Sequence, residues 1–102
     1  MSFKNSLSDA IAAEARLIIL RELAGQTDGR LSSLSIRSIL DVHAIRRDGD
    51  WIATQLRKLE SLGAVELGEA GSTLIAKITR TGRDHVEERA VLSGVARPSE
   101  AE

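Results

Sequence analysis

The spacing of apolar residues changes at Gly63, and this change limits the folds that are open to the chain. Before Gly63, apolar residues recur three and four positions apart, which is the spacing of one face of an α-helix. After it, Val65 and Leu67 alternate with a polar residue, which is the spacing of a half-buried β-strand. We therefore expect helices followed by a small sheet.

Three segments before Gly63 have helical spacing, and a glycine or a polar turn follows each of them. They cover about 8–24, Ser32 or Ser33 to His43, and about 50–62. The third segment has one narrow apolar stripe, which consists of Ile52, Leu56, Leu59 and Leu62. Asp48 or Asp50 can cap its start, because a side-chain oxygen there accepts a bond from a free backbone N–H. Gly25 and Gly63 stand where the first and third helices should stop.

A hairpin and a last helix follow. Two short strands, at Val65–Leu67 and 73–79, flank a tip over residues 68–72 that contains two glycines. Such a hairpin is not stable alone, so its apolar side must pack on the helices. Thr79 can cap a last helix that ends at about Val91 or Leu92.

This order of elements predicts a mainly α fold with a small β-hairpin. Three helices, a two-stranded hairpin and a C-terminal helix describe a winged helix-turn-helix, in which the hairpin is called the wing. We expect one domain over residues 1–92 and a C-terminal tail over residues 93–102, which contains Pro98.

Composition argues against several classes of function. The chain of 102 residues has 14 Lys and Arg against 15 Asp and Glu, so it has no strongly basic coat. It has no Cys, and His43 and His85 lie far apart in the sequence, so we expect no metal and no cofactor. We expect His85 on the surface. Only Phe3 and Trp51 are aromatic, which leaves no stacking platform for single strands.

The sequence also lacks the motifs that are typical of enzymes and of membrane proteins. We see neither a glycine-rich phosphate loop nor an activated nucleophile, so we do not expect an enzyme. We see no apolar run of about 18 residues and no signal-peptide pattern, so we expect a cytoplasmic protein without a membrane partner.

The stretch from Trp51 to Val86 resembles winged-helix transcriptional repressors of the MarR and ArsR type. In those families the recognition helix ends in Leu-x-x-x-Gly-apolar-Val, and the wing leads to apolar-Thr-x-x-Gly. The residues that match are Leu59, Gly63, Ala64, Val65, Ile78, Thr79 and Gly82. The resemblance covers about a third of the chain. It implies a transcription regulator that binds double-stranded DNA.

A second resemblance, to small winged-helix proteins encoded in Mu-like prophages, covers most of the chain. Those proteins begin with a Leu-Ser-Asp-Ala-Ile helix, here Leu7 to Ile11, and an Arg-Leu-x-Ile-Leu segment, here Arg16 to Leu20. They end in a Gly-Val-x-Arg-Pro-Ser tail, here Gly94 to Ser99. This resemblance implies a phage-derived origin and little about mechanism.

In the repressor pattern, the third helix enters the major groove and its outward side chains contact DNA. The predicted DNA-binding residues are Arg46, Arg47, Trp51, Thr54, Gln55, Arg57 and Lys58. Gln55 can pair with adenine, and Thr54 can contact a thymine methyl group or a phosphate. The cations can reach phosphates, which supply much of the affinity of a DNA-binding protein. The segment from Arg30 to Lys58 contains six basic residues and three acidic ones, so its net charge is positive.

The same residues allow other interpretations. The cations can form a solvated face, and Asp50 would repel phosphate if it faced the groove. Trp51 can pack on the second helix, fill a dimer contact or stay exposed as an anchor for a partner. The wing has Glu66 and Glu69 and no cation at its tip, which argues against its insertion into the minor groove.

The alternative function is therefore a winged-helix module that binds a phage or host protein without binding DNA. We also expect a homodimer, because the apolar stripe of the first helix is broader than a three-helix core requires.

Overall fold

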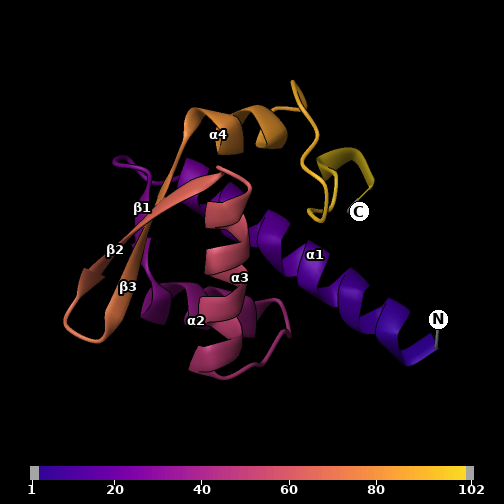
Figure 1. Cartoon of the computed structure of the whole chain (residues 1–102), viewed down its shortest axis with the longest axis horizontal. Helices are drawn as coiled ribbons and strands as arrows, with labels where there is room; N and C mark the ends of the chain where they lie inside the picture. Colours follow the sequence, from indigo (N-terminus) through magenta and orange to yellow (C-terminus); the bar gives the residue numbers. More distant parts are fainter. Residues whose placement is uncertain (1–2, 101–102) are drawn as a thin grey trace.

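The computed structural model describes residues 3–100, and Figure 1 shows their arrangement. In chain order the elements are helix α1 (Phe3–Ala24), strand β1 (Arg30–Ser32), helices α2 (Ser33–Val42) and α3 (Gly49–Ser61), strands β2 (Val65–Ala70) and β3 (Thr73–Ile78), helix α4 (Arg80–Val86) and a 3-10 turn (Pro98–Glu100). The fold is mainly helical with a small antiparallel sheet, and the predicted fold class, a winged helix, is confirmed.

Helix α1 supplies much of the core. Among residues 6–24 of this helix, the buried ones lie in its second half, and they are Ala15, Leu17, Ile18, Ile19, Leu20 and Leu23. The first half extends to one side of the molecule, where Leu7 is 51% exposed (Figure 1). The helix begins at Phe3, earlier than the predicted start near residue 8, and it ends before Gly25 as predicted.

Helices α2 and α3 form the helix-turn-helix, and a side-chain oxygen caps each of them. Ser32 Oγ accepts the N–H of Ser35 at 3.1 Å, and Asp48 Oδ1 accepts the N–H of Trp51 at 2.9 Å. Asp48, rather than Asp50, is therefore the cap of α3. The apolar stripe of α3 lies in the core as predicted, because Ile52, Leu56 and Leu59 are all buried there.

The sheet has three strands in the order β1-β3-β2, one more than the predicted hairpin. Strand β1 pairs with β3, so that Leu31 lies opposite Ala76, which lies opposite Leu67 on its other side. This row packs against the helical core. Sequence periodicity did not predict β1, because three residues are too few to show alternation.

Helix α4 is shorter than predicted. It begins after Thr79, whose Oγ1 accepts the N–H of Gly82 at 3.2 Å, so the predicted cap is confirmed. The predicted end at Val91 or Leu92 is wrong, because the helix ends at Val86 and the chain turns at Glu88 with a φ of 61°. The residues beyond Val86 offer too few apolar side chains to bury another helical turn.

The C-terminal segment, residues 87–100, returns across α1 instead of leaving the body of the protein. Val95 is buried, and the N–H of Ala96 donates to the carbonyl of Ala13 in α1 at 3.1 Å. Residues 101–102 of the predicted tail lie outside the described part of the chain. That residues 1–92 form a domain without this segment stays a prediction. Among residues 3–100, none of the helices combines the length and apolar character needed to cross a membrane.

Candidate nucleic-acid interface

The outward face of α3 is polar and short. Asp50, Thr54 and Arg57 are exposed and lie opposite the buried stripe, since residues 50, 54 and 57 follow helical spacing. Thr54 Oγ1 donates to the carbonyl of Asp50 at 3.0 Å. These three residues therefore offer one cation, one hydroxyl group and one carboxylate to a partner.

The turn before α3 adds two exposed cations near the start of the helix. Arg46 and Arg47 are both exposed. The guanidinium of Arg47 lies over the ring of Trp51, 5.4 Å from its centroid, a distance at which a cation–π attraction acts. Trp51 is half-buried against the core, so it packs and supports Arg47 at the same time.

Gln55 does not belong to the outward face, and its predicted contact with a base is wrong. Its side chain is only 3% exposed, and its Oε1 accepts the Nε–H of Arg16 at 2.9 Å. Residue 55 is three positions after Ile52 and four before Leu59, which places it within the buried stripe of α3. A buried amide needs a hydrogen-bonding partner, and α1 supplies it.

Arg16 connects three parts of the molecule. Besides its bond to Gln55 in α3, its Nη1 donates to the carbonyl of Gly94 in the C-terminal segment at 2.7 Å. Burial lowers the pKa of the Arg16 guanidinium, and the negative charge of Asp9 opposes that effect. Arg16 still carries its charge at neutral pH, because an arginine begins from a pKa far above 7.

Lys58 lies at the flank of α3, away from its outward face. It is exposed and lines an open hollow with Arg16, Asp9, Gly94 and a row of alanines of α1. Its ammonium group is therefore beside the C-terminal segment rather than beside Arg57. The seven predicted residues thus divide into an outward group (Arg46, Arg47, Thr54, Arg57), a flank (Trp51, Lys58) and one buried residue (Gln55).

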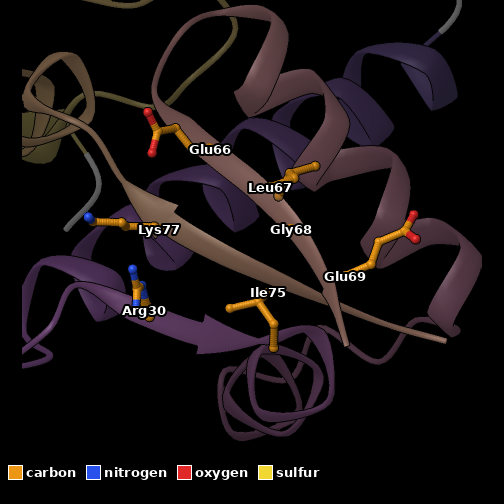
Figure 2. A pocket seen from close by; sticks show the side chains of 7 residues that line it. All are labelled: Arg30, Glu66, Leu67, Gly68, Glu69, Ile75 and Lys77. Carbon is orange, nitrogen blue, oxygen red and sulfur yellow. The ribbon is translucent and has the colours of Figure 1, made fainter. Parts of the chain in front are cut away.

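Glu66 and Lys77 of the wing lie on the outer side of the sheet, whereas Glu69 points to the same side of β2 as Leu67 (Figure 2). Lys77 of β3 lies opposite Arg30 of β1 on one side and Glu66 of β2 on the other. These residues border an open hollow of about 370 Å³ over Gly68. The mixture of signs at the sheet contrasts with the turn before α3, and the pairing of Arg30 with Lys77 was missed because β1 was missed.

His85 is not on the surface, so the expectation for it is wrong. Its side chain is fully buried, and both ring nitrogens contact the backbone of the C-terminal segment. Among residues 3–100, His, Asp and Glu side chains form no cluster of three or more that could hold a metal ion.

Comparison with known protein families finds no match, and comparison with curated proteins finds none either. Among solved structures, the hsRosR-S4 complex is similar to this chain, with a TM-score of 0.62 and 22% sequence identity. The match covers 72% of this chain and 64% of that one, so it spans less than two thirds of its neighbour. At this identity, the likeness shows a shared fold.

Proposed function

We propose that the protein is a winged-helix transcription regulator that binds double-stranded DNA through α3. The observation that carries the proposal is that Arg46 and Arg47 are exposed just before α3 and Thr54 and Arg57 are exposed along it, while the opposite face of α3 is buried. The first turns of a recognition helix contact bases in the major groove, and cations at its start hold the phosphates. The fold shared with hsRosR-S4 supports this assignment.

In this proposal each exposed group has its own task. Arg46 and Arg47 contact the phosphate backbone before the helix, and the ring of Trp51 limits the freedom of Arg47. Thr54 and Arg57 face the groove, and Lys58 reaches a phosphate at the flank. Asp50 also faces the groove, where its carboxylate can accept a hydrogen bond only from the amino group of a cytosine or an adenine.

Two further parts of the proposal come from the sequence. The first is a phage-derived origin, from the likeness to proteins of Mu-like prophages. The second is a homodimer, for which the exposed Leu7 on the projecting half of α1 offers an apolar contact. Sedimentation of the wild type and of Leu7→Lys tests the homodimer, and a wild type that stays monomeric at micromolar concentration contradicts it.

Fluorescence anisotropy with duplex DNA tests DNA binding. We expect binding that weakens steeply between about 50 mM and about 200 mM salt, and that is tighter on DNA from the gene's own neighbourhood than on random duplex. The double variant Arg46→Ala/Arg47→Ala should reduce the slope of log affinity against log salt by about 2, because each lost phosphate contact removes about 0.9.

The matched control is Arg80→Ala/Arg89→Ala. It removes the same charge from α4 and the segment after it, at the other end of the molecule (Figure 1). Equal losses in both double variants would show a general charge effect and would contradict the use of α3. No binding of the wild type even at low salt would reject the proposal.

A protein-binding module is the second candidate, and the outer side of the sheet favours it. The open hollow over Gly68 is lined by Glu66 and Glu69 together with Arg30 and Lys77, so the sheet offers a recessed surface with charges of both signs. Glu66 and Glu69 repel the phosphate backbone and suit a basic partner instead. If DNA binding fails, Glu66→Lys should abolish capture of such a partner while leaving the fold intact.

A further inference from the structure

A short strap, residues 92–96, connects the end of the chain to the recognition helix. At one end the N–H of Leu92 donates to Nδ1 of His85 at 3.0 Å. At the other end, Nε2 of His85 lies 2.8 Å from the carbonyl of Ala96. Between them Val95 is buried. One histidine side chain therefore joins both ends of the strap to α4.

These two contacts fix the proton of His85. Because Leu92 donates to Nδ1, that nitrogen carries no proton, and the proton of the neutral ring lies on Nε2, which donates to Ala96. A second proton would have to sit on Nδ1, where it would face the N–H of Leu92. The closed strap therefore accepts neutral histidine and has no acceptor for the imidazolium.

The strap continues to α3 through one side chain. Its Gly94 carbonyl accepts Nη1 of Arg16, and Nε of the same guanidinium donates to the buried Gln55. Because the guanidinium is rigid and planar, both bonds share one orientation of the side chain. Loss of the Gly94 bond thus frees the group that holds Gln55.

Charged groups of both signs surround His85. They are Arg83 and Asp84, which precede it on α4, and Glu88 and Arg97, which line the same hollow. Glu88 and Arg97 are exposed and line the same hollow as the ring, so water screens their opposite charges. The hydrogen bonds of the ring to Leu92 and Ala96, rather than these charges, therefore decide whether the neutral or the protonated form of His85 is compatible with the closed strap.

We propose that His85 is a positioning residue, whose neutral form holds the strap closed and thereby keeps Arg16 and Gln55 in the arrangement that sets α3 for DNA binding. Protonation of His85 opens the strap, so DNA binding weakens as the pH falls. The DNA part of this inference rests on the proposed function, whereas the link from strap to α3 does not.

The test compares protein at about pH 8 with protein at a series of lower pH values, down to the pH at which the core itself begins to unfold, and a strap that stays protected throughout overturns the inference. Hydrogen exchange, expressed as protection factors that correct for the intrinsic effect of pH, follows the amides of Leu92 and Ala96. NMR follows the side-chain amide of Gln55. We expect lower protection of both strap amides and a shifted Gln55 signal at the lower pH, with DNA affinity about 3- to 10-fold weaker.

Two variants separate the histidines. His85→Gln keeps a donor for Ala96 and cannot be protonated, so it should remove the pH dependence of the strap and of Gln55. His43→Gln changes the other histidine, which is exposed at the end of α2, and should leave that dependence intact. A dependence that survives in His85→Gln overturns the inference.

The wild type provides an answer even if His85→Gln does not fold. The strap amides and Gln55 should then shift with the same midpoint as the ring signals of His85, and a midpoint that follows His43 overturns the inference. Shifts at Gln55 without any DNA binding at about pH 8 would reject the proposed function and leave the coupling supported. If the strap amides lose protection while the side-chain NMR signal of Gln55 does not change, the coupling is rejected.

Discussion

Helix α3 and the C-terminal segment pack on the same core, but different interactions hold them there. Three apolar side chains of α3, Ile52, Leu56 and Leu59, are almost completely buried. The C-terminal segment fully buries one, Val95, packs Leu92 and Ala96 partly against the core, and adds hydrogen bonds to His85, Arg16 and the backbone of α1.

The difference has a physical consequence for each region. Apolar burial does not depend on pH, and here it involves the whole core, so α3 should separate from the body only when the protein unfolds. Hydrogen bonds to one titratable ring can be lost without disturbing the core. The C-terminal segment can therefore open as a local unit.

The strongest test of the α3 side of this comparison is Leu56→Ala. We expect a loss of about 2–5 kcal/mol in the free energy of unfolding, because a fully buried leucine leaves a cavity. Urea denaturation should still show one transition, since α3 and the core unfold together. A loss below about 1 kcal/mol would mean that α3 is held by something other than its apolar stripe.

Val95→Ala tests the segment in the same way, with a smaller expected effect. Two buried methyl groups contribute about 1–2 kcal/mol. The loss should appear mainly as faster exchange of the Ala96 amide, while the core amides of α3 keep their protection. If the α3 amides lose protection equally, the segment does not open separately and the comparison fails.

Asp48→Ala measures how much a hydrogen bond at the start of α3 contributes to the free energy of unfolding. Removal of the carboxylate that accepts the N–H of Trp51 should cost about 1 kcal/mol of thermal or urea stability. Asp48→Asn keeps the acceptor and should recover most of it. Asp50→Ala is the matched control, because it removes the same charge without removing the cap, and should cost only a few tenths.

The smallest effect is expected at Arg97. Its guanidinium lies 3.6 Å from the carboxylate of Glu100, and both side chains are more than half exposed. Solvent screening leaves such a pair worth about 0–0.5 kcal/mol, so Arg97→Ala should leave the unfolding midpoint almost unchanged. A clear loss would show that Arg97 contributes to closure of the segment by another contact.

Much of the fold could be predicted from local sequence. The apolar stripe of α3 and the cap at Thr79 depend on residues within one or two helical turns, and both were predicted. Strand β1 could not be predicted, because its pairing depends on β3 near the other end of the domain.

The candidate site was predicted less well, for a related reason. The position of Gln55 within the apolar stripe contained a signal of burial, but its partner Arg16 lies 39 residues earlier in the chain. His85 sits on a helix whose apolar pattern is weak, and its partners follow 7 and 11 residues later, beyond the helix end. Periodicity describes faces of single elements, whereas these polar contacts join elements that no local pattern relates.

The strand order β1-β3-β2 also bears on how the chain is made. Arg30 leaves the ribosome long before Lys77, the residue opposite it in the sheet. During that interval the ribosome synthesises the residues of α2, α3 and β2. Strand β1 still lacks its neighbour in the sheet, which is β3. Completion of the sheet, and with it the covering of Leu31, is thus a late event in the synthesis of this protein.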